Sequence, residues 1–282
     1  MTLPSDFHFS QGSLQAYMDC PRQFQLRYVR RLRWPAIETE PVLENERHLR
    51  QGVAFHRLIR QHLTGIPAQV LSRATTSAKL RRWWQNYLAY GLVDVPVHRY
   101  PEVRLATSLG DYRLVAQYDL IAFDPSGRVA IVDWKTNRHR PQRGWLSDRL
   151  QTRVYPCVLV ESGEVLSGSR ASERGLVTMT YWFANYPSAP ERFSYDEAQY
   201  RADKAYLLNL VEEIEQKIGR CTEDSLLAPA EDQGKCAICH YRSLCERGVE
   251  PGRLDEMARE ESSQGMFDFT LDFEQIGEAE VG

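Results

Sequence analysis

The chain has 282 residues, of which 43% are hydrophobic and 26% charged, a composition that argues against disorder and suffices for one sizeable domain with insertions. No stretch approaches the roughly 18 apolar residues of a membrane span, and the N-terminus has no secretory signal, so we expect a cytoplasmic protein. The net charge of −3 is the sum of +5 on residues 1–249 and −8 on residues 250–282, which contain ten acidic residues and two arginines. The positive charge of residues 1–249 is compatible with a nucleic-acid ligand.

The first part of the chain is predicted to be helical. A first helix is expected between an N-cap at Ser10 and Pro35. Its arginines form either a solvated face or a patch for the DNA backbone: Arg22, Arg27, Arg30, Arg31 and Arg33. A second helix is predicted over residues 45–63, with a buried side formed by Val53, Phe55, Ile59 and Leu63. A third is predicted over residues 77–90, and its two adjacent tryptophans are more typical of a core than of a base-stacking platform: Trp83 and Trp84.

Alternation of apolar and polar residues then replaces the helical periodicity. Three strands are predicted over residues 102–108, 112–123 and 128–134, joined by hairpin turns at 109–111 and 124–127. They are followed by a helix at 146–159, a strand at 176–183 and a long helix at 195–218. This order of elements predicts a mixed α/β fold in which helices flank a sheet that contains an antiparallel meander.

Two aspartates and a lysine meet on the last predicted hairpin. Counting back from its turn sets Asp119 opposite position 132 or 133, and alternation places Asp133 and Lys135 on the same face. Adjacent carboxylates repel each other unless a cation lies between them, and a divalent ion such as Mg²⁺ prefers oxygen ligands. A surface salt-bridge cluster is the alternative. The apolar run 129–132 is, however, typical of a buried strand that delivers polar groups at its end.

Four short motifs occur in order along the chain: Gly52-x-x-x-His56, Asp119-Leu120-Ile121, Ile131-Val132-Asp133-Trp134-Lys135-Thr136 and Gln151-x-x-x-Tyr155. Together they resemble the motifs of RecB-type PD-(D/E)xK nucleases, which include CRISPR-associated RecB-like exonucleases and AddB-type nuclease domains. The likeness spans about residues 10–248. It implies a restriction-endonuclease-like α/β core with a mixed central sheet flanked by helices.

The resemblance also implies the composition of an active site. A Mg²⁺ or Mn²⁺ ion would be held by two acids, one histidine and one backbone carbonyl: Asp119, Asp133, His56 and Trp134. The catalytic groups would be Lys135, Asp133, Asp119, Gln151 and Tyr155. In this set the lysine would assist the attack of water on a phosphodiester.

Three details qualify this picture. Gln151 and Tyr155 stand four residues apart and share a helix face, which the resemblance places against the active site and the DNA strand. Glu102 lies on the preceding strand and is a candidate accessory acid. Ala116 and Gln117 stand where a glycine often precedes the first aspartate, a departure that removes no ligand.

Four of the six cysteines form a second constellation. Cys236, Cys239 and Cys245 are close in sequence, and Cys20 lies near the other end of the chain. The spacing alone fits either Zn²⁺ or a [4Fe–4S] cluster, and His240 is a further candidate ligand. RecB-like nucleases with one cysteine before the core and three after it resemble this arrangement, which implies a [4Fe–4S] cluster joining the two ends of the domain. The remaining cysteines are expected to be inert thiols: Cys157 and Cys221.

The expected domain layout follows from these motifs. Residues 1–249 form a nuclease domain with a helical insertion at about 36–95 and an iron–sulfur clip between Cys20 and residues 236–245. Residues 250–282 form an acidic, flexible tail. Its apolar residues leave a self-docking strand or a partner-binding segment as alternatives: Met266, Phe267, Phe269, Leu271 and Phe273.

The expected function is a metal-dependent DNA nuclease, an exonuclease on single-stranded ends, in repair, recombination or CRISPR defence. Because no G-x-x-x-x-G-K-[ST] motif is present, unwinding would come from a helicase or another CRISPR or repair partner. One alternative is a catalytically silent iron–sulfur DNA-binding subunit of a helicase–nuclease complex, against which the complete active-site set argues. Another is a zinc-stabilised binding module, which would lack the visible absorption of iron.

Overall fold

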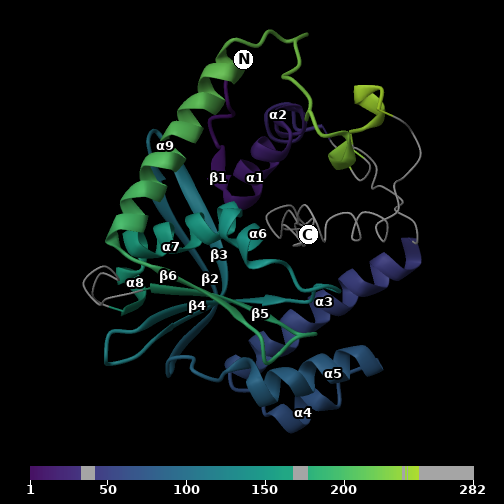
Figure 1. Ribbon diagram of the computed structural model, residues 1–282, viewed down its shortest axis with the longest axis vertical. Helices are drawn as coiled ribbons and strands as arrows, with labels where there is room; N and C mark the ends of the chain where they lie inside the picture. Colours follow the sequence, from purple (N-terminus) through teal and green to yellow (C-terminus); the bar gives the residue numbers. More distant parts are fainter. Residues whose placement is uncertain (33–41, 168–176, 237–238, 240, 248–282) are drawn as a thin grey trace, which may run out of the picture.

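The computed structural model in Figure 1 has a mixed sheet at its centre and describes residues 1–32, 42–167, 177–236, 239 and 241–247. The six strands of the sheet are β1 (His8–Ser10), β2 (His98–Leu109), β3 (Tyr112–Phe123), β4 (Val129–Lys135), β5 (Val177–Phe183) and β6 (Glu191–Tyr195). Their order is β1-β3-β4-β5-β6, with β2 paired to β3 outside this path. The predicted fold class, a mixed α/β sheet flanked by helices, is therefore confirmed.

The helices of the described residues fall into three groups along the chain. The N-terminal group is α1 (Gln11–Asp19), α2 (Pro21–Phe24) and the π-helix Gln25–Val29. The second group falls within the predicted insertion and is α3 (Val42–Leu63), α4 (Ala68–Ser72), α5 (Ala78–Asn86) and the π-helix Tyr87–Gly91. The third comprises α6 (Arg143–Asp148), α7 (Leu150–Ser162), α8 (Glu164–Ser167), α9 (Glu197–Gly219) and the 3-10 turns Gln233–Cys236 and Ser243–Cys245. No described helix is both long and apolar enough to cross a membrane.

Helices lie on both sides of the sheet (Figure 1). Each face of the sheet carries its own apolar core. On one face, residues of α1, α7 and α9 pack against β3, β4 and β5. On the other, α3, α4 and α5 pack against a smaller set of strand residues with a core rich in aromatic side chains: Phe55, Trp83, Trp84, Tyr87, Trp134 and Trp182. The two predicted core tryptophans are 0% and 1% exposed, so the core interpretation of Trp83 and Trp84 is confirmed.

The predicted meander is present and its register follows from its turns. The strands β2, β3 and β4 pair antiparallel, and Leu120 stands opposite Val132. Gly110 and Gly127 adopt φ values of 61° and 88° in the two turns, a region that glycine enters without a steric penalty. The strands β1 and β6 were not predicted, because three and five residues are too few for a period of two to be recognised.

The prediction of one N-terminal helix up to Pro35 is wrong. The Ser10 cap is present, since its side chain accepts from the amide of Ser13. The helix ends at Asp19, because Cys20 adopts an extended conformation (φ −162°, ψ 105°) and Pro21 starts a new helix at its first position. Cys20 thereby caps both helices and is placed at a corner of the backbone, where its sulfur accepts hydrogen bonds from the amides of Gln23 and Ala230.

The arginines of this segment are neither a solvated face nor a free DNA-binding patch. Arg22 and Arg30 donate to backbone carbonyls of the segment that follows α9, at Leu227 (2.8 Å) and Ser225 (2.9 Å). Arg27 lies over the ring of Tyr28, and Arg31 pairs with Asp6. Arg33 lies outside the described residues. Two of these arginines, Arg22 and Arg30, therefore join the N-terminal helices to the segment after α9.

Two further sequence predictions need correction. The single helix at 146–159 is two helices, because Arg149 is extended (ψ 137°) and separates α6 from α7. Val53 is 38% exposed, whereas Phe55 and Ile59 are buried as predicted. The acidic tail, with the apolar residues singled out in it, lies outside the described residues.

Candidate active site

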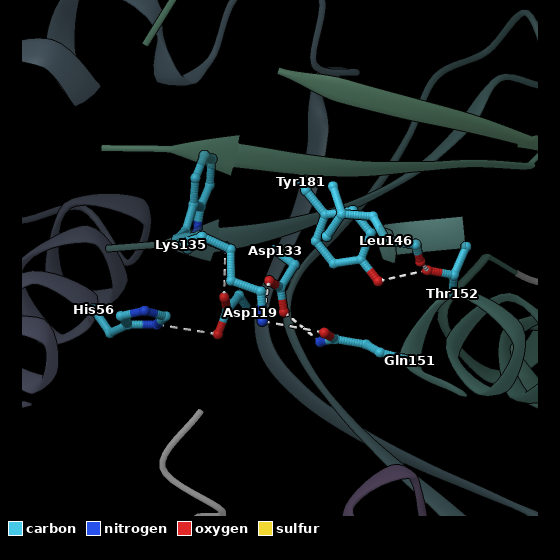
Figure 2. Close-up of polar contacts among 9 residues, drawn as sticks. His56, Asp119, Asp133, Lys135, Leu146, Gln151, Thr152 and Tyr181 are labelled. Atoms are coloured by element: carbon cyan, nitrogen blue, oxygen red, sulfur yellow. Dashed lines mark hydrogen bonds and ion pairs between the residues drawn. The ribbon is translucent and has the colours of Figure 1, made fainter. Parts of the chain in front are cut away.

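The polar residues of the predicted constellation gather where β3 and β4 leave the hairpin core (Figure 2). The pairing of β3 with β4 ends at Leu120 and Val132, and Asp119 and Asp133 are the next residues of the two strands on the side away from the turn. The helix α3 contributes His56 from one side, and α7 contributes Gln151 from the other. The site therefore lies between the two helical layers, at the end of buried strands.

Asp119 is held by two donors. Its Oδ2 accepts a hydrogen bond from the backbone amide of Trp134 at 2.8 Å, and its Oδ1 lies 3.2 Å from Nδ1 of His56 (Figure 2). The first contact fixes the carboxylate to the neighbouring strand, and the second ties it to α3. Burial alone would raise the pKa of Asp119, but the attraction of His56 and the Trp134 amide lower the pKa below its usual value.

The approach of α3 to the sheet depends on a glycine. Gly52 stands one turn before His56, and a Cβ atom there would come within 3.2 Å of Oγ1 of Thr136. This distance is tighter than most real Cβ contacts, so a side chain would push the helix away from the loop that follows β4. The Gly-x-x-x-His spacing thus brings the imidazole to Asp119.

Asp133, Lys135 and Gln151 form a closed and buried polar triangle. Lys135 Nζ lies 3.0 Å from Asp133 Oδ2 and donates to Gln151 Oε1 at 3.1 Å, while Gln151 Nε2 donates to Asp133 Oδ1 at 2.6 Å. Their exposed fractions are only 5%, 5% and 2%. Because a buried charge is costly unless it is paired, Asp133 and Lys135 compensate each other's charge, and Gln151 adds one hydrogen bond to each of them.

The imidazole of His56 is surrounded by carboxylates. Burial alone would lower its pKa, but Asp119, and then Asp133 and Glu102, raise the pKa above its usual value. Burial and the charge of Asp119 raise the pKa of Glu102, which places this candidate accessory acid beside the site. Glu102 has a φ of 53°, a left-handed conformation that costs a non-glycine residue about 1–2 kcal/mol.

Two tyrosines complete the surroundings. Tyr155 lies one turn after Gln151, and burial together with the charges of Asp133 and Asp119 raises its pKa well above the usual value. Tyr181 was missed by the sequence analysis. Its ring centroid lies 5.7 Å from Lys135 Nζ, and its hydroxyl lies 2.8 Å from that of Thr152. Only the parallel register of β4 and β5, which is a long-range pairing, sets Tyr181 opposite Asp133.

The donor set at this site suits a hard divalent cation, since it offers two carboxylates, an imidazole and a backbone carbonyl. In the part of the chain that the structure describes, no three His, Cys, Asp or Glu side chains converge closely enough to hold a metal ion. Lys135 and His56 lie instead against the oxygens of Asp133 and Asp119. Lys135 and His56 thus supply positive charge beside the carboxylates of Asp133 and Asp119.

Cys20, Cys236, Cys239 and Cys245, the four cysteines predicted to bind a cluster, lie near one another between the N-terminal helices and the C-terminal turns. Burial and the neighbouring Cys20, Cys245 and Cys236 raise the pKa of Cys239 to about 11. Arg247 Nη1 donates to Cys236 Sγ at 3.4 Å. All four are free and half-buried thiols. Among the described residues they do not form a closed metal site, and the further candidate ligand His240 lies outside those residues.

The chain matches the family model described as the PD-(D/E)XK nuclease superfamily over residues 8–246. A candidate exonuclease from Eubacterium rectale has a similar fold, with a TM-score of 0.50 and 9% sequence identity over 92% of this chain and 98% of that chain. The crystal structure of SSO0001 is similar with a TM-score of 0.43 and 12% identity, over 88% of this chain and 90% of that chain. None of the curated proteins matches the chain.

Proposed function

The chain belongs to the PD-(D/E)XK nuclease superfamily, and from this premise we propose that it is a metal-dependent deoxyribonuclease that acts on single-stranded ends. The observation that carries the proposal is the convergence of His56, Asp119, Asp133, Lys135 and Gln151 at one end of the sheet. The preference for single-stranded ends follows from the motif resemblance. A helicase or another repair or CRISPR partner would supply the strand.

In this proposal, each residue has a defined task. Asp119, Asp133, His56 and the carbonyl of Trp134 would hold Mg²⁺ or Mn²⁺. When bound, such an ion neutralises charge on the phosphate and lowers the pKa of a water molecule. The Trp134 amide orients Asp119, and Gln151 orients Asp133.

Lys135 is the residue that we propose to act on the reacting groups. Its ammonium group is held by Asp133 and Gln151 and lies beside the ring of Tyr181, in a place with little water. A cation fixed in a site of low polarity stabilises the charge that develops on a phosphate, and it is able to orient the attacking water. Tyr155 would border the path of the DNA strand along the same helix face as Gln151.

The test is cleavage of end-labelled single-stranded and duplex DNA with Mg²⁺ or Mn²⁺. We expect cutting by the wild type, a loss of at least about 100-fold in Lys135→Ala and Asp133→Asn, and a product ladder that shows the polarity. Glu213→Gln serves as a control, because Glu213 pairs with Lys217 on the exposed side of α9. Intact DNA with both metals, from folded wild-type protein, would refute the proposal.

We further propose that Cys20, Cys236, Cys239 and Cys245 hold a [4Fe–4S] cluster. The support is chemical: four neighbouring thiols, and N–H groups of Gln23, Ala230 and Arg247 directed at two of the sulfurs. Hydrogen bonds of this kind stabilise cluster-bound thiolates. Anaerobic purification should give brown protein with about four irons per chain. Colourless protein with one zinc per chain would favour the zinc alternative.

A further inference from the structure

A row of side chains crosses three strands at the level of the proposed active site. Asp133 of β4 stands opposite Tyr181 of β5, and Tyr181 stands opposite Glu191 of β6. Residues paired in this way point to the same face of a sheet. Since neighbouring strands lie about 4.8 Å apart, Glu191 is roughly 10 Å from Asp133 on the face covered by α7.

Glu191 binds two arginines at once. Its Oε1 pairs with Arg140, and its Oε2 accepts from Arg143 Nη1 at 2.9 Å. The glutamate side chain is 12% exposed, whereas those of Arg140 and Arg143 are 39% and 57% exposed. The guanidinium of Arg143 also lies 4.3 Å from the ring centroid of Phe193. One buried carboxylate therefore fixes two partly exposed cations, and the group keeps a net charge of +1.

The two arginines belong to the segment that leaves the active site. Arg140 follows Lys135 by five residues, and Arg143 begins α6, directly before the helix that carries Gln151. The segment that carries both arginines thus directly follows the strand that carries Asp133 and Lys135. No residue of the proposed metal site contributes to the cluster, so it is a separate feature of the surface.

We propose that Arg140 and Arg143, held by Glu191, form a binding site for a phosphate of the DNA backbone next to the bond that is cut. This inference rests on the proposed nuclease function. Guanidinium groups have five N–H donors each, and one carboxylate uses only part of them. A strand carries a charge about every 3.4 Å along its axis, so the roughly 10 Å offset corresponds to a phosphate within about three nucleotides.

The role of Glu191 distinguishes this proposal from a simple basic surface. On a simple basic surface, Glu191 would weaken DNA binding, and its removal would tighten binding by exposing two free cations. In a built site, Glu191 fixes the geometry of the two guanidinium groups, and its removal lets them move. Loss of this positioning lowers the rate of cleavage even though the net positive charge increases.

The experiment measures binding of a phosphorothioate single strand, which resists hydrolysis, over a series of salt concentrations. Arg140→Gln/Arg143→Gln should weaken binding and lower the slope of log affinity against log salt by about 1. The matched control is Arg128→Gln, because Arg128 pairs with Asp124 at the opposite end of β4. Glu191→Gln should keep the wild-type slope but cut natural DNA several-fold more slowly at saturation.

Each outcome separates the two proposals. An unchanged slope in the double variant, or faster cutting by Glu191→Gln, overturns the phosphate site while leaving the nuclease function intact. If the wild type binds DNA but does not cut it, the proposed nuclease function fails, and the slope still tests the binding site. Thermal unfolding of each variant identifies a loss of fold, and in that case the single variants Arg140→Gln and Arg143→Gln repeat the measurement.

Discussion

Gln151 is the residue that links the two charges of the proposed catalytic pair. It donates to Asp133 and accepts from Lys135, and it is 2% exposed. Replacing Gln151 with alanine keeps the ion pair of Asp133 and Lys135 but removes the hydrogen bonds that fix the orientation of the two side chains. We expect Gln151→Ala to lower the turnover rate by roughly 10- to 100-fold, the usual cost of losing such a supporting hydrogen bond. Single-turnover cleavage measures this, and a rate within twofold of wild type would contradict the assignment. Thr152→Ser is the neighbouring control.

The surroundings of His48 predict how the stability of the fold depends on pH. Burial, and then the charges of Lys79 and Arg138, lower its pKa to about 4, and Lys79 Nζ lies 2.7 Å from its Nδ1. In the unfolded chain a histidine has a pKa of about 6.5, so a histidine whose pKa is lower in the folded state stabilises the fold at any pH above about 6.5. As the pH falls from about 6.5 toward 4, the unfolded chain binds the proton first, and this stability is lost. The contact between α3 and α5 should therefore weaken on acidification.

The measurement is thermal unfolding between pH 7 and pH 5.5. The wild type should lose about 1 kcal/mol more stability over this range than His48→Gln, which has no group to protonate. Protein without added metal is used, so that protonation of metal ligands does not contribute. Equal pH dependence of the two proteins would show that His48 titrates normally.

At the same scale, the sequence identified the charged residues and several of their neighbours but missed two residues, Tyr181 and Glu191. The hairpin turn fixes the register of β3 and β4, so Asp119, Asp133 and Lys135 were predictable as a group from local pairing. Tyr181 and Glu191 join them only through the parallel pairing of β4 with β5 and the pairing of β5 with β6. Such contacts between distant segments leave no periodic signal in one sequence.

At the scale of elements, the position of α3 decides whether the site is complete. Gly52→Ala should favour the helix by up to about 1 kcal/mol through helix propensity, but its Cβ would press on Thr136. We expect activity to fall roughly tenfold without a loss of thermal stability, because His56 moves away from Asp119. Gly144→Ala is the matched control, since nothing lies within 4 Å of its new Cβ.

The companion variant Gly52→Ala/Thr136→Ala tests the cause. Removing Oγ1 of Thr136 clears the space into which the new methyl group projects, so part of the lost activity should return. Metal-dependent cleavage rates of the four proteins are compared at saturating Mn²⁺. A double variant as slow as Gly52→Ala would show that the contact does not position His56.

The helices and strands that the sequence predicted well are long or lie next to a turn with a clear sequence signal. The strand β3 was predicted with its observed bounds and β4 within one residue, because each lies next to a turn with a clear chemical signal. The extended Cys20 between α1 and α2 was not predicted, since helical periodicity continues through it. The short α4 and the two π-helices were also not predicted as such, because five residues give no measurable period.

At the scale of the whole molecule, hydrogen bonds between side chains of the N-terminal helices and the backbone hold the segment after α9 against these helices. Gln25 is 0% exposed, and its side chain donates to the carbonyl of Ser225 (3.0 Å) and accepts from the amide of Leu227 (2.7 Å). Arg22 and Arg30 add contacts to the same segment. The same segment contacts Cys20, whose sulfur accepts from the amide of Ala230, before it leads to the C-terminal cysteines.

We therefore expect the clasp, defined by the contacts of Gln25 with Ser225 and Leu227, to form before a cluster binds. Gln25→Ala leaves the amide of Leu227 without its partner, whereas the carbonyl of Ser225 keeps its bond from Arg30. The change should cost about 1–3 kcal/mol and expose Cys20 in cluster-free protein. The rate of thiol labelling and the thermal midpoint measure both effects, with Gln23→Ala as the control on the same helix. Unchanged labelling in Gln25→Ala would mean that the cluster itself, rather than the clasp, brings the cysteines together. Labelling that rises in Gln25→Ala and falls again after iron reconstitution would show that the clasp positions the cysteines and that the bound cluster then stabilises this arrangement.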